Sequence, residues 1–348
     1  MFIDAHVHLR DFKQKYKETV KHGLGVAYDS GLDAVFDMPN TDPPIITRDL
    51  VLERLRLAKE SNIPIFYGLF IGLIPDNEQI KKAIDIYREF KQVVGMKLYA
   101  GHSVGTLGII NKKSQYFIYN TLAKEGYDGV LAVHAEKESY IYKILWNPKL
   151  PITHCLARSE IAEVESIKDQ LEIADQTSFK GKLHITHISS PKAVELVEKA
   201  RSFGRDISCG ICPHHFIYDS SSMSYKNGIL MKMNPPLRNL NSKEKMFQYL
   251  SDGKIDWIET DHAPHSLEEK INAPFMSGIP GLPWWPLFEE YLRFKGFSDD
   301  KIEKLTFFNI LKRFNLDLSR SKKNIKDHRK DYPFNPYHII EKQLGWKE

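Results

Sequence analysis

The chain has 348 residues, of which 42% are hydrophobic and 27% are charged. This balance allows a sizeable buried core and excludes global disorder. The formal net charge of +4 is small, and the basic residues are scattered apart from a short run at Lys322, Lys323 and Lys326. We interpret that run as a solvated surface, so binding to nucleic acid is not expected.

Membrane insertion and secretion are not expected either. No uninterrupted apolar run approaches the roughly 20 residues that cross a bilayer. The first residues, MFIDAHVHLR, lack the basic and apolar regions of a secretory signal. The cysteine content is low, with only Cys155, Cys209 and Cys212, which is typical of a reducing compartment. The sequence therefore predicts a cytoplasmic protein.

Short β-rich runs alternate with longer amphipathic stretches along almost the whole chain. The predicted strands are Phe2–Val7, Asp33–Asp37, Pro64–Phe70, Val93–Leu98, Gly129–Val133, Lys182–Thr186, Asp206–Ile211 and Trp257–Glu259. The predicted helices between them include Asp49–Glu60, Asn77–Phe90, Lys113–Lys124, Arg158–Ala174, Pro191–Ala200 and Ser242–Leu250. This alternation predicts βα units and a parallel sheet. Eight such strands would close a (β/α)8 TIM barrel, and a doubly wound open sheet is the alternative.

No low-complexity linker divides the chain. We expect a barrel domain over residues 1–316, in which Leu282–Phe294 and Asp299–Leu316 continue as helices. The remaining residues, 317–348, are charged at first and then rich in proline and aromatic side chains. We expect this C-terminal extension to pack on the barrel or to be partly extended.

Metal-competent side chains follow several of the predicted strands. His6 and His8 end the first strand, where a side-chain period of two directs both to one face. An HxH pair alone would more often be incidental. Here, however, four further strand ends carry side chains of the ligand type, namely Lys97, His134, His187 and Asp261. The carboxyl ends of barrel strands meet at one rim, and imidazole and carboxylate ligands suit Zn²⁺ or a similar divalent ion.

Lys97 is unusual because a buried ammonium group is costly unless it is paired or chemically changed. A carbamate formed with CO₂ would convert it into an anionic ligand able to bridge two metal ions. An unmodified Lys97 would repel a second ion and leave a mononuclear centre. Asp261 is placed to bind a metal and also to move a proton from the nucleophile to the leaving nitrogen. A metal pair of this kind favours hydrolytic chemistry, because it acidifies water and polarises a carbonyl.

The motifs DAHVHLR, MPNT, GMKLY, HAE, HITH, CPHH, NPPLR and TDHAPH resemble those of the dihydroorotases of the amidohydrolase superfamily. The resemblance runs from about Asp4 to Leu316. It implies a zinc-dependent cyclic amidohydrolase on a TIM barrel of the metal-dependent hydrolase type. The implied reaction is the reversible cyclisation of N-carbamoyl-L-aspartate to L-dihydroorotate in de novo pyrimidine biosynthesis, by metal-bound hydroxide chemistry with Asp261 as acid/base.

The same resemblance implies roles for individual residues. His6 and His8 would bind the more buried of two Zn²⁺ ions, His134 and His187 the more exposed one, and carboxylated Lys97 would bridge them. The substrate carboxylate would be held by Arg10, Asn40 and His265, and the pyrimidine ring by Asn234 and the backbone near Gly278. The forked donor of arginine and the amide of asparagine also fit an anionic planar substrate on their own chemistry.

The segment AGHSVGTLG, residues 100–108, follows the fourth predicted strand and contains three glycines. We expect it to act as a lid that closes over substrate and excludes water. Relatives use a threonine or serine of this loop to contact substrate, and Ser103 is the matching residue. The alternative is an ordinary flexible βα loop.

The chain departs from its relatives in two ways. They usually carry a small β-sandwich built from segments before the first strand and after the barrel. This chain begins at the first strand, and its tail lacks glycine-rich strand signals, so we expect a barrel without that accessory domain. Many relatives also have a carboxylate where Gly210 stands, and any metal contact from that position would be lost.

The remaining polar motifs of the barrel have simpler interpretations. The CxxC pair of Cys209 and Cys212 has no matching second pair, so we interpret it as a buried strand end rather than a redox or zinc site. His184, His214 and His215 are expected to pack or to support the ligands rather than to bind the metal ions directly.

Two other functions remain open from the sequence. A hydantoinase-like or allantoinase-like hydrolase would share the chemistry, but Arg10 and Asn40 argue against it. A non-catalytic scaffold partner of aspartate transcarbamoylase would be expected to have lost ligands, whereas all six candidates are present. The expected partner is the small-molecule substrate, with a homo-oligomer or an association with aspartate transcarbamoylase as further possibilities.

Overall fold

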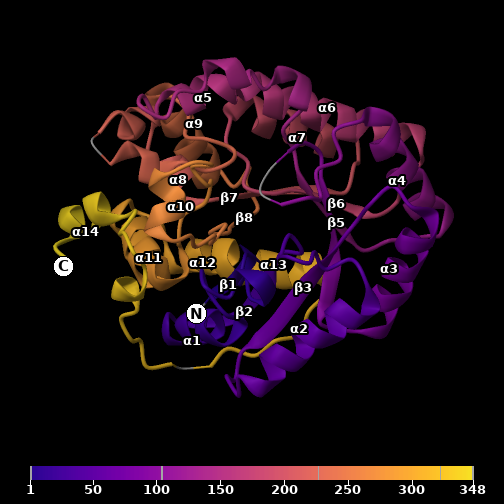
Figure 1. The fold of residues 1–348 in the computed structure, drawn as a ribbon, viewed down its shortest axis with the longest axis horizontal. Coiled ribbons are helices and arrows are strands. Elements are labelled where there is room, and N and C mark those ends of the chain that lie inside the picture. The colour runs from indigo at the N-terminus through magenta and orange to yellow at the C-terminus, as the bar shows by residue number, and fades with distance from the viewer. Residues whose placement is uncertain (1, 103–104, 226, 322, 347–348) are drawn as a thin grey trace.

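The computed structural model describes residues 2–102, 105–225, 227–321 and 323–346. Eight parallel strands follow one another in chain order and form a nearly closed barrel with helices around it (Figure 1). They are β1 (Phe2–Val7), β2 (Leu32–Asp37), β3 (Phe66–Gly72), β4 (Val93–Tyr99), β5 (Val130–His134), β6 (Lys182–Ile185), β7 (Ile207–Ile211) and β8 (Trp257–Ile258). The first and last strands approach each other where Val7 forms a parallel bridge with His262. The predicted TIM barrel is therefore confirmed.

The strands form because they are apolar enough to be buried on both faces, as parallel strands between helices must be. β2 reads LDAVFD and is buried along its whole length. Ala34 and Phe36 point into a cluster inside the barrel, together with Trp257, whereas Val35 packs in the layer between strands and helices. The barrel interior is therefore a packed core, and only its rim is free to carry a site.

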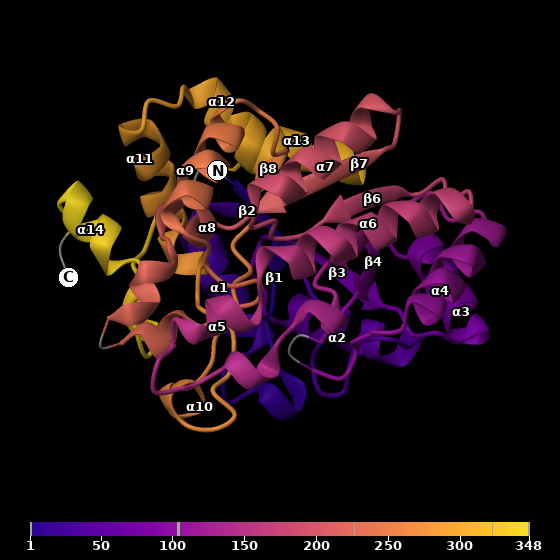
Figure 2. The ribbon, with the colours of Figure 1, turned by 90° about the horizontal axis from the view of Figure 1, so that it is seen from above.

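The helices cover the outside of the strands, and Figure 2 shows α6 and α7 side by side there. Their bounds are α1 (Val20–Asp29), α2 (Arg48–Glu60), α3 (Asn77–Glu89), α4 (Lys112–Lys124), α5 (Thr153–Ala157), α6 (Glu160–Gln176), α7 (Pro191–Ser202), α8 (Pro213–Ile217), α9 (Leu240–Ser251), α10 (Leu267–Ile271), α11 (Trp285–Phe294), α12 (Asp299–Glu303), α13 (Asn309–Phe314) and α14 (His338–Leu344). No helix among the described residues is long and apolar enough to cross a bilayer.

The eight predicted strands and the six predicted helices between them have ends within two residues of the observed ones. The single helix predicted over Asp299–Leu316 is wrong in detail. A π-helical turn, Lys304–Phe308, separates α12 from α13, and Asn315 ends the segment in the left-handed region with φ of 51°. The helix predicted over Leu282–Phe294 begins as a 3₁₀ turn, and α11 itself starts at Trp285.

The tail runs along the outside of the barrel past α1 and ends beside α11 (Figure 1). The backbone N–H of Lys326 donates to the Asp29 carbonyl at 2.9 Å, and the Tyr332 hydroxyl donates to Glu18 at 2.7 Å. Glu341 of α14 accepts the indole N–H of Trp284 at 2.8 Å. The described part of the tail is thus attached to the barrel, and the domain boundary at residue 316 stays a prediction.

Candidate active site

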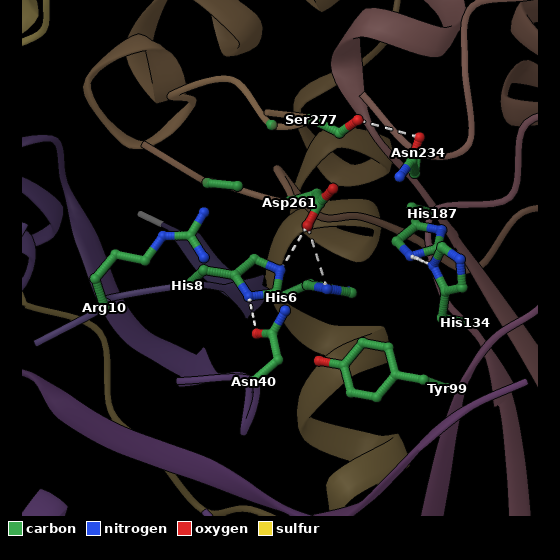
Figure 3. A pocket seen from close by; sticks show the side chains of 12 residues that line it. His6, His8, Arg10, Asn40, Tyr99, His134, His187, Asn234, Asp261 and Ser277 are labelled. Atoms are coloured by element: carbon green, nitrogen blue, oxygen red, sulfur yellow. Dashed lines mark hydrogen bonds and ion pairs between the residues drawn. The ribbon is translucent and has the colours of Figure 1, made fainter. Parts of the chain in front are cut away.

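A small cavity, with about 20 Å³ of space for the centres of water-sized molecules, lies at the carboxyl ends of the strands (Figure 3). The side chains around it come from segments far apart in the sequence. They are His6, His8, Arg10, Asn40, Tyr99, His134, His187, Asn234, Asp261, Ala263, Ser277 and Gly278. The structure therefore brings most of the predicted site residues to one place. Lys97 and His265 lie buried next to this lining, and Ser103 lies outside the described residues.

His6, His8 and Asp261 converge in the centre of the cavity (Figure 3). Asp261 Oδ1 lies 2.9 Å from His8 Nε2 and 3.3 Å from His6 Nε2. The other ring nitrogen of His8, Nδ1, lies 2.6 Å from Asn40 Oδ1. An amide oxygen only accepts, so Nδ1 carries the hydrogen in the neutral ring and Nε2 presents a lone pair to a carboxylate. The lone pair of His8 Nε2 and the Asp261 carboxylate face each other, and they repel unless a proton or a cation lies between them. These side chains therefore fit a metal ion.

The ionisation of these groups also suits a metal ion. Burial acts to raise the pKa of Asp261, but a proton shared with His8 and the charge of the neighbouring imidazoles, when they are protonated, hold it below its usual range. Burial lowers the pKa of His6 to about 4, and the nearby Lys97 acts in the same direction. The carboxylate is therefore ionised and the His6 imidazole neutral at neutral pH, which are the forms that bind metals.

His134 and His187 form a second pair of nitrogens on the other side of the cavity. His134 Nδ1 faces His187 Nε2 at 3.1 Å. Two nitrogen ligands on one tetrahedral Zn²⁺ are roughly 3.4 Å apart, so little movement would be needed to bind an ion between them. Burial lowers the pKa of both rings. His134 Nε2 lies 3.1 Å from Glu136 Oε2, and this carboxylate opposes the effect of burial on the His134 pKa.

Lys97 lies fully buried and within electrostatic reach of both groups, and its ammonium group donates to Thr186 Oγ1 at 3.0 Å. Burial lowers its pKa to about 7, although the charges of Glu259 and Asp261 oppose this. A large fraction of Lys97 is therefore the neutral amine near pH 7, which is the form that reacts with CO₂.

Three site residues have backbone conformations that side-chain-bearing residues seldom adopt. Arg10, His187 and Asp261 have φ angles of 44°, 40° and 50°. The left-handed region is unfavourable for residues with a Cβ, and such strain is often found at functional positions. In this protein the three residues follow β1, β6 and β8, and their backbone conformations direct the three side chains into one cavity.

Arg10 lies buried at the edge of the cavity and is held by a neighbouring network. Its guanidinium approaches His265 Nε2 at 3.2 Å and donates to the Pro264 carbonyl at 3.3 Å. Arg54 donates to the Arg10 carbonyl at 2.8 Å and is itself paired with Asp37. His265 therefore lies behind Arg10 and positions it, rather than lining the cavity.

The wall next to Arg10 and His265 is built from the segment around Ser277 and Gly278, and the Ser277 carbonyl lies 3.1 Å from His265 Nε2. The Gly278 N–H donates to the Lys232 carbonyl at 2.9 Å, and the Gly278 carbonyl accepts from Lys270 Nζ at 2.7 Å. Lys232 Nζ donates to Ser277 Oγ at 2.7 Å, and Ser277 Oγ approaches Asn234 Oδ1 at 3.3 Å. The Gly278 N–H is therefore already used, and the Gly278 carbonyl has one lone pair left to accept a hydrogen bond from a ligand.

The sequence interpretation missed Glu259, which is fully buried beneath the cavity. Glu259 accepts from the His187 N–H at 2.6 Å, and it lies 3.7 Å from His6 Nδ1. It also missed Tyr99 and Ser277 in the lining. Glu259 could have been found, because it stands two residues before Asp261 and a strand directs such side chains to one face.

Glu136 and Arg158 connect the His134 pair to the predicted lid. Arg158 binds the Glu136 carboxylate with its NH2 group at 2.7 Å, and the same group donates to the His102 carbonyl at 2.8 Å. The described end of the segment 100–108 is thus hydrogen-bonded to the neighbourhood of His134. Its action as a lid stays a prediction.

Comparison with known proteins gives relatives in sequence and in fold, although no family model matches the chain. The chain is 33% identical over 298 residues to a dihydroorotase from Lactobacillus gasseri, covering 80% of this chain and 64% of the relative. It is 34% identical over 281 residues to a dihydroorotase from Pyrococcus horikoshii, covering 80% and 57%. The chain thus spans slightly less than two thirds of the length of the curated relatives it matches.

Solved structures share the barrel. An L-hydantoinase from Arthrobacter aurescens has a TM-score of 0.79 at 24% identity, covering 90% of this chain and 70% of that one. A dihydroorotase from Campylobacter jejuni has a TM-score of 0.69 at 18% identity, covering 91% and 83%. The resemblance to the dihydroorotases that the motifs predicted is therefore confirmed by relatives in sequence, and the barrel is the fold of these solved amidohydrolases.

Proposed function

We propose that this chain is a metal-dependent cyclic amidohydrolase that interconverts N-carbamoyl-L-aspartate and L-dihydroorotate. One observation carries the proposal: His6, His8 and Asp261 meet in a cavity that also holds the His134 and His187 pair. The guanidinium of Arg10 and the amide of Asn40 line the same cavity, and they suit a substrate with a carboxylate. The names of the relatives in sequence support the same reaction.

The proposed cofactor is a pair of Zn²⁺ ions. His6 and His8 would hold one ion, His134 and His187 the other, and Lys97 carboxylated by CO₂ would bridge them. Asp261 would be a further ligand of the first ion. When bound, such a pair supplies Lewis-acid activation of water and of the amide carbonyl.

Asp261 is the proposed acid/base. It is ionised at neutral pH and lies at the centre of the cavity, so it is able to accept a proton from the attacking water. In the hydrolytic direction the amide C–N bond of the ring breaks, and Asp261 delivers that proton to the leaving nitrogen. In the reverse direction the ureido nitrogen attacks the side-chain carboxyl group, and water leaves.

The other polar residues of the cavity would orient the substrate. Arg10 and Asn40 would bind its carboxylate, and His265 would act through Arg10, whose guanidinium it touches. Asn234 and the free lone pair of the Gly278 carbonyl would contact the ring. Such positioning lowers the entropic barrier, because the reacting groups are held together before reaction. The segment 100–108, including Ser103, would close over the substrate.

The test follows interconversion of the two compounds by the purified protein, before and after chelation and after zinc is restored. We expect turnover that chelation abolishes and zinc restores, and that Asp261→Asn lacks while remaining folded. Absence of turnover in a folded, zinc-loaded sample would overturn the proposal.

A separate variant distinguishes this substrate from neutral cyclic amides. Arg10→Met should raise the KM for dihydroorotate strongly, because the carboxylate loses its charged partner. A hydantoinase-like or allantoinase-like enzyme would instead process hydantoin or allantoin, and Arg10→Met would spare that activity. Association with aspartate transcarbamoylase, or between copies of this chain, stays a prediction that size-exclusion chromatography can test.

A further inference from the structure

Three potential metal ligands lie together at the beginning of α8, directly after β7 and outside the predicted metal centre. Cys212, His214 and His215 are all buried, and one ligand atom of each lies within 4.8 Å of the other two. None of the three is among the residues that line the cavity, and none belongs to the group of His6, His8 and Asp261.

The two imidazoles each present a buried nitrogen without a partner. Nδ1 of His214 and Nδ1 of His215 have no hydrogen bond to any described residue. His215 Nε2 lies 3.1 Å from the Pro235 carbonyl, which only accepts, so Nε2 carries the hydrogen. Nδ1 of His215 is therefore a free lone pair in the interior, and burial keeps the ring neutral by lowering its pKa. Buried polar atoms are rarely left unsatisfied, so these two need an explanation.

Cys212 supplies the third donor and stands at the N-terminal cap of α8. Burial raises the pKa of its thiol, and the charges of Asp261 and Glu259 add to this. The same negative charges favour a cation at the sulfur, which would release the thiol proton on binding. The other cysteine of the CxxC pair takes no part, because Cys209 Sγ points to the Lys254 carbonyl at 3.8 Å.

We propose that Cys212 Sγ and the Nδ1 atoms of His214 and His215 form a separate binding site for a thiophilic cation of the Zn²⁺ type. One thiolate and two imidazoles are a ligand set that selects such ions over Mg²⁺ or Ca²⁺, and three ligands leave a fourth position open. Ligand atoms on a tetrahedral Zn²⁺ are roughly 3.5 Å apart, so ligand atoms that lie within 4.8 Å of one another would approach by about 1.3 Å at most. The CPHH motif is thus a metal-binding motif in this chain rather than a packing motif.

The bound ion would fasten α8 to the end of β7. Through the His215 contact with Pro235 it would also fix the segment that carries Asn234, a residue of the cavity wall. None of the three ligands is assigned to the metal pair of the proposed function, so the site can exist whether or not that function is correct.

The test uses Co²⁺ as the probe, added to reduced, metal-free protein. A thiolate bound to Co²⁺ gives a charge-transfer absorption in the near ultraviolet, whereas imidazole, carboxylate and carbamate ligands of the cavity do not. We expect this band to saturate with about one bound Co²⁺ per chain in addition to any ions in the cavity. A wild-type protein without the band at excess Co²⁺ would overturn the proposal.

Cysteine variants identify which thiolate binds Co²⁺. The band should be lost in Cys212→Ser and kept in Cys155→Ala/Cys209→Ala, in which Cys212 is the only thiol left. A band that is missing from that double variant, with its fold intact by circular dichroism, would show that another cysteine binds the ion. The double variant shows whether Cys212 binds Co²⁺ even if Cys212→Ser does not fold.

Histidine variants identify the remaining ligands. His214→Gln and His215→Gln should each weaken Co²⁺ binding at the thiolate by about tenfold or more, because one of three protein ligands is removed. Unchanged affinity in both folded variants would contradict the proposed ligand set.

Discussion

The carboxylate of Glu259 lies so close to Gly210 that a Cβ on that glycine would come within 2.5 Å of the carboxylate carbon. Glu259 reaches this place from β8 and accepts from the His187 N–H at 2.6 Å and from the Trp257 indole at 2.9 Å. The sequence interpretation expected a contact to be lost at Gly210. That expectation stays a prediction, and the structure shows that the space beside Gly210 is filled by a carboxylate from the neighbouring strand.

Gly210→Ala should therefore displace Glu259 and disturb His187. Inserting a methyl group into such a packed place costs about 1–3 kcal/mol of unfolding free energy. Denaturation in urea measures that loss, and metal content measured on the same sample should fall. Gly25→Ala is the matched control, because no atom lies within 4 Å of its added Cβ. Equal stability of the two variants would show that Glu259 is not confined by Gly210.

Lys97 should make metal binding depend on both pH and CO₂. Its pKa is lowered to about 7 by burial, so the amine is neutral above this pH and protonated below it. The neutral amine reacts with CO₂, hence protein loaded with zinc at pH 8 in bicarbonate should hold more metal than protein loaded at pH 6 without CO₂. Atomic absorption measures the metal.

In Lys97→Ala this difference between the two conditions should vanish, and turnover should fall by about 100-fold or more. A small carboxylate such as acetate should restore part of the metal content by filling the space of the carbamate. If Lys97→Ala holds the full complement of zinc, the bridging role is wrong.

Arg54 should be essential for stability although it lies outside the cavity. Its guanidinium is fully buried, is paired with Asp37, and donates to the Arg10 carbonyl at 2.8 Å. Arg54→Met would leave the Asp37 carboxylate buried without its charged partner, although Tyr67 and Leu9 still donate to it, and losing such a partner costs about 3–5 kcal/mol. Urea denaturation of the variant measures this loss.

Arg56→Met on the same helix is the control, because Arg56 pairs with Glu53 and Glu60 at the exposed surface. Such surface pairs contribute little, so its stability should barely change. Similar losses in the two arginine variants would contradict the role assigned to the buried pair.

Lys232 should make the protein more stable in moderately alkaline solution. Burial lowers its pKa to about 8 from an ordinary value of 10.5, and the charge of Arg158 acts in the same direction. Between these two values the unfolded chain binds more protons than the folded chain, so the free energy of unfolding rises with pH. The total rise is about 3 kcal/mol at most. Denaturation at pH 7.5, 9 and 10 measures it.

Lys232→Met should lack this rise, whereas Lys124→Met, which removes an exposed lysine of α4, should keep it. Comparing the variants removes the contribution of other groups that titrate in the same range. A wild-type curve parallel to that of Lys232→Met would contradict the lowered pKa.

Local periodicity was sufficient to predict the barrel. Strands such as Val93–Tyr99 are apolar over a whole short run, and helices such as α3 place Ile80, Ala83 and Ile84 on one buried face. α1 is not among the predicted helices named above, and its Gly23 and Gly25 lower its helix propensity. Its Gly23 is required by packing, since a Cβ there would lie 2.5 Å from Leu9 Cδ2. That contact joins residues that are separated in sequence and close only in the folded structure, so it leaves no local signal.

The amino-acid sequence by itself determined which residues meet at the rim, because the carboxyl ends of parallel barrel strands must lie together. His6, His134, His187 and Asp261 could be assigned to one cavity on that ground. Only the tertiary structure decided how the side chains are partnered. It placed Glu259 beside Gly210 and left the imidazoles after β7 with unpaired nitrogens. These relationships depend on distances of a few ångströms between separate strands, which side-chain packing sets and strand order alone does not.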